Sequence, residues 1–263
     1  MQGNVAQPER VLLRRVVVKV SLWAAWVGYV GYLLLSELPP GRSLLHTEPA
    51  TLREALDLSL NFWFVMPLLF SQWSPSLNPA LEGLFNLVVA WGLLFWGFAV
   101  DGRGQRLPIV PFLVGTAFLT NVFYLPWLAL RHPNGDAVSL PLSRLERLGE
   151  GRGLPIALMG VAIASFVWAG VGRPEFGSLA QRWQSVVELV GSDRLAYSFV
   201  MDLLVFWVFQ AALVGDDMAR RGWKNQAMKW VVRLVPFVGL VLYLYQRPSL
   251  IAVEQFEKNC DQL

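Results

Sequence analysis

Long apolar runs separated by short polar segments form the dominant pattern of this chain. A run of about 20 apolar residues can cross about 30 Å of hydrocarbon as a helix that rises about 1.5 Å per residue. Such runs predict membrane-crossing helices at 16–35, 55–70, 81–100, 109–130, 154–171, 195–217 and 228–245. Residues typical of helix ends support these limits, among them Asn78-Pro79 before the third run. The expected fold is an all-α, polytopic integral membrane bundle of about seven transmembrane helices, with six or eight as alternatives.

The polar segments between the runs indicate how a single membrane domain, 1–263, is organised. A polar and basic stretch covers 1–15, a charged linker rich in Gly and Pro covers 131–153, and a polar tail covers 249–263. The first run resembles a signal peptide, but no small-residue cleavage site follows it, so we expect an uncleaved span. In 173–194, apolar residues recur at roughly helical spacing, which predicts one amphipathic helix lying at the membrane interface.

Composition supports a membrane protein. Hydrophobic residues make up 55% of the chain and charged residues 16%, whereas a soluble domain has about a quarter charged residues. The 12 Trp and 16 Phe suit membrane interfaces and lipid-facing surfaces. The net charge of +3 comes from short basic segments and not from a continuous basic face, so no nucleic acid is expected as a partner. The expected partners are membrane lipid and other membrane proteins.

Cysteine and histidine are too scarce for most metal chemistry. The single Cys260 excludes an internal disulfide and a cysteine metal site. The two histidines, His46 and His132, provide neither a buried bis-histidine haem nor a His-rich metal site, so no metal is predicted. His132 is either an ordinary histidine at headgroup level or an axial ligand of a tetrapyrrole. The aromatic residues are either packing or the walls of a groove for a flat or polyene ligand such as a carotenoid.

The basic residues also bear on orientation. With seven spans, the Lys and Arg residues are slightly more numerous on the side of the N-terminus. The positive-inside rule therefore predicts a cytoplasmic N-terminus.

One carboxylate, Asp202, lies about two turns into the run 195–217. A charged carboxylate at bilayer depth costs about 2.5–3.5 kcal/mol, so we expect other helices to shield it. Further polar residues occupy the first halves of the even-numbered runs and would lie at a similar depth; they are Asp57, Asn61, Thr116, Thr120, Asn121 and Ser198. Together they predict one polar pocket, which either serves proton transfer or ligand binding, or only joins the helices by hydrogen bonds.

A second polar set lies toward the opposite side of the predicted bundle: Glu82, Asn86, Gln210, Asp216, Asp217 and Arg233. Glu82 either complements the N-terminus of its helix or pairs with a cation. Arg233 either extends to the membrane surface or forms a structural ion pair with Glu82, Asp216 or Asp217.

Two segments carry a resemblance, NFWFVMPLLFSQWSPSLNPALEGLFN and FVMDLLVFWVFQAALVGDDMARR. They resemble uncharacterised multi-pass membrane proteins of cyanobacteria and plastids. There is a fainter similarity to neoxanthin-synthase-related membrane proteins, which place an Asp in a late span, a Gln further along, and a Pro-x-Gly element in the final span. The corresponding positions are Asp202, Gln210 and Pro236 to Gly239, written Pro-Phe-Val-Gly. The resemblance implies a photosynthetic membrane and an isoprenoid or pigment ligand.

Three functions remain open from the sequence. The first is a non-enzymatic accessory or assembly protein, holding pigments or partners in a thylakoid or plasma membrane; the absence of a catalytic motif favours it. The second is an intramembrane, isomerase-like acid–base enzyme on an isoprenoid or lipid, with Asp202 as acid or base, helped by Asn61 and Gln210. The third is a small ion-coupled transporter that uses Asp57 and Asp202, although no internal repeat is evident.

Overall fold

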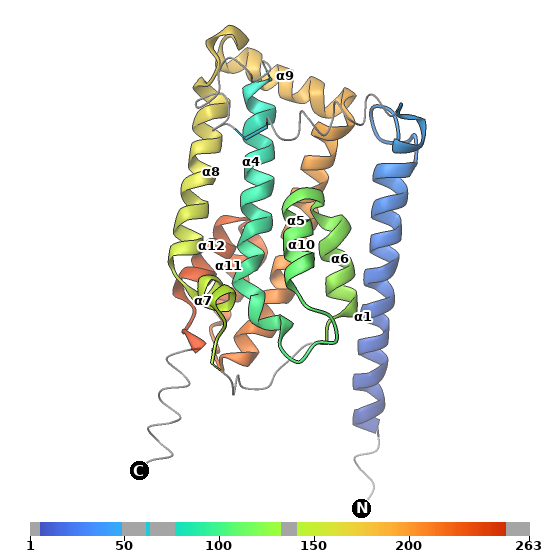
Figure 1. The fold of residues 1–263 in the computed structure, drawn as a ribbon, viewed down its shortest axis with the longest axis vertical. Helices are drawn as coiled ribbons and strands as arrows, with labels where there is room; N and C mark the ends of the chain where they lie inside the picture. Colours follow the sequence, from blue (N-terminus) through green and yellow to red (C-terminus); the bar gives the residue numbers. More distant parts are fainter. Residues whose placement is uncertain (1–5, 49–61, 64–76, 133–140, 251–263) are drawn as a thin grey trace, which may run out of the picture.

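The computed structural model describes residues 6–48, 62–63, 77–132 and 141–250, and every regular element in them is helical (Figure 1). Four of these helices are long and apolar enough to cross a membrane, by length and composition. The first, Val16–Leu35, consists of most of α1 (Ala6–Val30) and the π-helical turn η1 (Gly31–Leu35). The second, Pro79–Gly102, consists of α4 (Pro79–Leu94) and the 3₁₀ segment η3 (Phe95–Gly102). The other two are α8 (Gly153–Val171) and α10 (Arg194–Arg220). The all-α bundle is therefore confirmed for the described residues and is compatible with a membrane protein, whereas seven crossing helices are not confirmed.

The fourth apolar run, 109–130, is not one continuous helix. It forms α5 (Val110–Leu119) and α6 (Asn121–Leu130), which are separated by Thr120 with a positive φ of 43°. The two helices lie antiparallel and side by side (Figure 1). Gly115 permits this close packing, because a Cβ there would lie 2.4 Å from Cγ of Phe123. Each helix has 10 residues and spans about 15 Å, half the thickness of a bilayer core. We call this pair the α5–α6 hairpin.

The last run, 228–245, is broken in the same way. It forms α11 (Gln226–Leu234) and α12 (Val238–Gln246), with Pro236 and the positive-φ residue Phe237 between them. Trp223 before α11 stacks on Tyr243 near the end of α12, with ring centroids 5.7 Å apart, so the chain folds back on itself. We call this pair the α11–α12 hairpin. The prediction that these two runs each form one crossing helix is wrong, because the chain reverses at Thr120 and at Pro236–Phe237.

Two short helices define the ends of the bundle. The helix α9 (Leu179–Ser192) lies across one end, within the segment where an amphipathic helix is predicted (Figure 1). The helix α7 (Arg144–Glu150) lies at the opposite end, together with the bases of both hairpins (Figure 1). We refer to these as the α9 end and the α7 end. The turns η2 (Leu44–His46) and η4 (Pro174–Phe176) both belong to the α9 end.

The core is centred on α4 and α10. In the apolar window of α4 and η3, 72% of the residues are buried, against 6% in the window of α1, so α4 is central and α1 is peripheral. Gly83 lets α4 approach α8, since a Cβ there would lie 2.6 Å from the carbonyl oxygen of Ser165. At the α9 end, Arg194 anchors α1 by donating to the carbonyl oxygens of Leu33 and Ser36 at 3.0 and 2.8 Å.

Most of the second run, 55–70, lies outside the described residues, and so do Asp57 and Asn61. Phe62 is described: its side chain is buried and packs on Phe85 and Phe199. Other differences concern the segments outside the runs. The helix α1 begins at Ala6, within the basic stretch 1–15, and the linker 131–153 contains α7.

Candidate functional site

Asp202 lies in α10 and is 3% exposed. Its Oδ1 accepts three hydrogen bonds, from the hydroxyl of Tyr29 at 2.6 Å, from Oγ1 of Thr120 at 2.7 Å and from Nδ2 of Asn121 at 2.6 Å. Tyr29 belongs to α1, while Thr120 and Asn121 form the tip of the α5–α6 hairpin. We call these four residues the Asp202 cluster. It joins three elements that are distant in sequence through one carboxylate oxygen.

The hairpin tip suits a carboxylate for two physical reasons. The helix α6 begins at Asn121, so Asp202 lies at the end of the helix where the backbone dipole is positive. The reversal at Thr120 also places two polar side chains at the same point, where they donate to the buried oxygen instead of facing lipid. The cluster thereby offsets the cost of burying the acid.

Among the residues predicted to form the polar pocket, Thr120 and Asn121 reach Asp202. Thr116 and Ser198 instead donate to carbonyl oxygens of their own helices, those of Phe112 and Leu195, each at 2.7 Å. Asp57 and Asn61 lie outside the described residues.

Sequence reasoning missed Tyr29. Tyr29 lies in an odd-numbered run, whereas the predicted polar pocket contains residues of the even-numbered runs alone. The available signal was a phenol inside an apolar run, because a Tyr hydroxyl in such surroundings usually has a hydrogen-bond partner.

Gln210 holds the other hairpin. It is fully buried, and its Nε2 donates to the carbonyl oxygens of Val232 at 2.7 Å and Val235 at 3.3 Å, at the C-terminal end of α11. Its Oε1 accepts from Nε1 of Trp91 at 3.2 Å. Gln210 is about 12 Å further along α10 than Asp202, at about 1.5 Å per residue. The structure therefore does not bring these two predicted catalytic residues together: each binds the tip of a different hairpin.

Glu82 pairs with an arginine at the α9 end. Its carboxylate is fully buried and accepts from Nη2 of Arg173 at 2.9 Å and from Nε1 of Trp168 at 2.6 Å. Arg182 is also buried, and it donates to the backbone carbonyl oxygens of Gly172 at 2.5 Å and Arg173 at 2.9 Å. These contacts hold η4 and α9 against the ends of α4 and α8.

A network of buried ion pairs lies at the α7 end. Asp217 accepts from Arg247 at 2.8 Å, from Arg221 at 2.9 Å and from the hydroxyl of Tyr243 at 2.6 Å. Arg221 also binds Glu150 of α7. Burial alone would lower the pKa of Arg221, but its hydrogen bonds with Glu150 and the charge of Asp217 raise it above the ordinary value. The network fixes α7 and α12 against the end of α10.

A second part of this network contains Asp216. Arg131 bridges Asp216 at 2.5 Å and Asp101 at 3.0 Å, and Asp101 also pairs with Arg220. Of the two alternatives for Arg233, the ion pair is therefore not formed: other arginines pair with Asp216, Asp217 and Glu82. The reversal at Pro236 explains the difference, because it places Arg233 near the tip of the α11–α12 hairpin, where its guanidinium lies 5.3 Å from the ring of Trp230.

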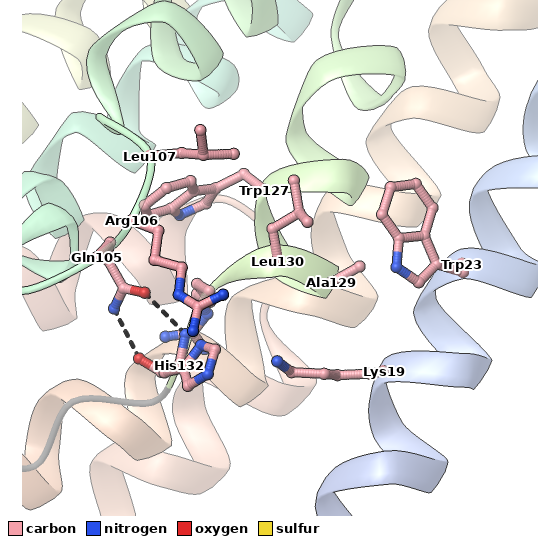
Figure 2. Close-up of a pocket in the computed structure, with 10 residues that line it drawn as sticks. Lys19, Trp23, Gln105, Arg106, Leu107, Trp127, Ala129, Leu130 and His132 are labelled. Carbon is pink, nitrogen blue, oxygen red and sulfur yellow. Dashed lines mark hydrogen bonds between the residues drawn. The ribbon is translucent and has the colours of Figure 1, made fainter.

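A cavity of about 410 Å³ lies between α1 and the base of the α5–α6 hairpin. We call it the α1–α6 cavity. Figure 2 shows the side chains of Lys19, Arg106 and His132 pointing toward one another at one side, with Trp23 and Leu130 on the other side in this view. The complete lining consists of Lys19, Trp23, Gln105, Arg106, Leu107, Trp127, Ala129, Leu130, Arg131 and His132.

The Asp202 cluster fixes the two helices that form the walls of this cavity. Tyr29 belongs to α1, as do Lys19 and Trp23, and Asn121 belongs to α6, as do Trp127 and Leu130. A further bond between the same helices runs from Nε1 of Trp26 to the carbonyl oxygen of Val122 at 2.9 Å. The spacing between the two walls therefore depends on polar contacts deeper in the bundle.

Among the described residues, no group of three His, Cys, Asp or Glu side chains is placed to hold a metal ion. Comparison of the chain with protein-family models, with curated proteins and with solved structures gave no match. The resemblance to cyanobacterial and plastid membrane proteins stays a prediction.

Proposed function

We propose that this chain is a multi-pass membrane accessory protein that holds a lipid-like amphiphile in the α1–α6 cavity. The observation that supports this function is the cavity itself, which combines apolar and cationic walls beside a peripheral helix. The isoprenoid or pigment ligand and the thylakoid or plasma membrane that the sequence implies belong to the same proposal.

The size and lining of the cavity fit part of an amphiphile. Its volume of about 410 Å³ falls within the range of about 300–1,000 Å³ that small-molecule sites occupy. The exposed side chains of Trp23 and Leu130 provide apolar contact area for a hydrocarbon chain or a flat ring. Because α1 packs mainly on α6, the ligand lies between the bundle and its outermost long helix.

The Asp202 cluster favours holding over catalysis. Oδ1 of Asp202 already accepts three hydrogen bonds from the chain, and these bonds tie α1 to the α5–α6 hairpin. The acid therefore acts as the joint between the two walls of the cavity. Gln210, the other proposed catalytic residue in the described part of the chain, is engaged with the α11–α12 hairpin.

A cavity-filling substitution tests the proposed function. Leu130 lines the cavity and is 38% exposed, so Leu130→Trp should fill the space without forcing a large side chain into the core. The matched control is Leu119→Trp, on the same hairpin but outside the cavity lining. The probes are dioleoylphosphatidylglycerol and dioleoylglycerol, which share their chains, and bound lipid is measured by native mass spectrometry of the detergent-purified protein.

The wild type and Leu119→Trp should retain lipid, and Leu130→Trp should lose it at an unchanged melting temperature. Equal retention of both probes by a folded Leu130→Trp variant would overturn the proposed function. Should Leu130→Trp not fold, Leu130→Phe provides a smaller filling side chain and should reduce retention in part.

A further inference from the structure

The cationic side of the α1–α6 cavity has a chemistry of its own, and this inference rests on the proposed function. We propose that Lys19 and Arg106 bind the phosphate of an anionic phospholipid-type headgroup, while the hydrocarbon part contacts Trp23 and Leu130. Figure 2 shows that the two cationic side chains approach the same point from different elements, α1 and the loop before α5.

Lys19 lies at the level expected for a headgroup contact. The apolar segment of α1 runs over Val16–Leu35, so Lys19 is one turn inside its beginning. A lysine at this position keeps its aliphatic part along apolar surface and places its ammonium group at the boundary with the polar headgroups. The ammonium group extends into the cavity, toward His132 (Figure 2).

Among the described residues, those that line the cavity carry a surplus of positive charge. Arg131 also lines it, but its charge is balanced by Asp101 and Asp216. Within the part of the chain that the structure describes, neither Lys19 nor Arg106 forms an ion pair with a carboxylate. An anion between Lys19 and Arg106 would therefore meet two cations that no described carboxylate neutralises.

The loop that bears Arg106 is held in place before any ligand binds. Nε2 of Gln105 donates to the carbonyl oxygen of His132 at 2.7 Å, and the backbone N–H of His132 donates to Oε1 of Gln105 at 2.9 Å (Figure 2). This reciprocal pair fastens the loop to the end of α6. Less conformational entropy is lost on binding when the binding groups are already positioned.

Phosphate is the anion that this arrangement favours. A guanidinium group presents several N–H donors to phosphate oxygens, and an ammonium group adds a compact charge. The apolar walls favour a phosphate attached to hydrocarbon chains over free phosphate, because only the lipid also buries apolar surface against Trp23 and Leu130.

Charge-removing variants test the headgroup contact. Lys19→Gln and Arg106→Gln should each weaken binding of dioleoylphosphatidylglycerol about fivefold, and the double variant should weaken it about twenty-fivefold. These factors correspond to a contribution of about 1 kcal/mol from each basic residue near an anionic lipid. Binding of dioleoylglycerol should not change. Arg144→Gln removes an exposed charge at the same end of the bundle and is the matched control, with neither affinity changed. Lys19→Arg should retain phosphatidylglycerol binding.

The variants and the two lipids distinguish failure of the headgroup inference from failure of the proposed function. If phosphatidylglycerol binds the double variant as tightly as the wild type, while Leu130→Trp still abolishes binding of both lipids, the headgroup inference is overturned and the proposed function stands. If Leu130→Trp has no effect on either lipid, both are overturned. Inorganic phosphate and glycerol 3-phosphate are tested as competitors, and displacement of the lipid at equal concentration would assign the site to free phosphate and overturn the lipid assignment.

Discussion

At the residue scale, one buried carboxylate oxygen ties α1 and the α5–α6 hairpin to α10. Bonds to an ionised acceptor are roughly twice as strong as neutral ones. Asp202 accepts three donors on one oxygen, so its replacement affects three elements at once. Ser198, one turn earlier in α10, bonds only within its own helix.

We therefore expect Asp202→Asn to destabilise the bundle by about 1–2 kcal/mol, because an amide oxygen accepts these bonds more weakly. Ser198→Ala should cost less than about 0.5 kcal/mol. The measurement is unfolding of the two variants in the same detergent. Equal effects of the two substitutions would show that the Asp202 cluster does not join the three elements.

A second residue-scale prediction concerns α7. Arg103 binds both carboxylate oxygens of Glu146 at 2.6 and 2.8 Å, and these bonds lower the pKa of Glu146 from 4.5 to about 2. Since the folded state lowers this pKa, the pair stabilises the protein above pH 4.5 and loses its effect as the pH falls toward 2. The difference in stability between the wild type and Glu146→Gln should shrink over that interval, measured as melting temperature against pH. Arg103→Gln should remove the same pH dependence, and a difference that stays constant down to pH 2 would contradict the assignment.

At the element scale, the two hairpins show what an apolar run does not reveal. A run such as 109–130 has the length and hydropathy of one crossing helix or of two half-length helices, and hydropathy alone does not distinguish them. The decision depends on partners far along the chain: Thr120 binds Asp202, 82 residues away. The polar pair Thr120-Asn121 and the Pro236-to-Gly239 element were visible signals of a break. Described runs without such signals, including 154–171, form long apolar helices as predicted.

The α11–α12 hairpin provides a test at this scale. A Cβ on Gly239 would lie 2.7 Å from the carbonyl oxygen of Val231, so Gly239→Ala should push the two helices apart and destabilise the protein by about 1–3 kcal/mol. Gly160 in α8 has no atom within 4 Å of an added Cβ, so Gly160→Ala should be neutral or stabilise the helix by up to about 1 kcal/mol. Thermal unfolding of both variants compares the two sites, and a neutral Gly239→Ala would contradict the close packing.

At the scale of the whole molecule, the hairpins change the distribution of charge between the two ends. Each hairpin returns to the α7 end, so Arg131 and Arg247 lie at the same end as the start of α1 (Figure 1). In the described residues, the basic residues of the α9 end are Arg42, Arg173, Arg182 and Arg194. Those of the α7 end include Arg103, Arg106, Arg131, Arg144, Arg147, Arg152, Arg220, Arg221, Lys224 and Arg247. The seven-span prediction yields a smaller asymmetry, because it assigns Arg103, Arg106 and Arg247 to the side opposite the N-terminus.

The positive-inside rule therefore leads us to expect the α7 end in the cytoplasm. Single cysteines in a Cys260→Ser background test this: Leu148→Cys in α7 and Leu45→Cys at the α9 end are both on exposed residues, at 53% and 68%. A membrane-impermeant maleimide added to intact cells should label Leu45→Cys and should label Leu148→Cys only after permeabilisation. The reverse pattern would invert the orientation.

Thr120 donates a hydrogen bond to Asp202, which is synthesised much later. This order has a consequence for biosynthesis. At about 5–20 residues per second, the ribosome needs about 4–16 seconds to synthesise the chain between the hairpin tip and the acid that accepts its hydrogen bonds. During that interval the nascent polar tip has to be sheltered by the insertion machinery or by water at the membrane surface. We therefore expect membrane integration of α5 and α6 to be completed only after α10 emerges, and a chain truncated before Asp202 should leave this segment accessible to protease.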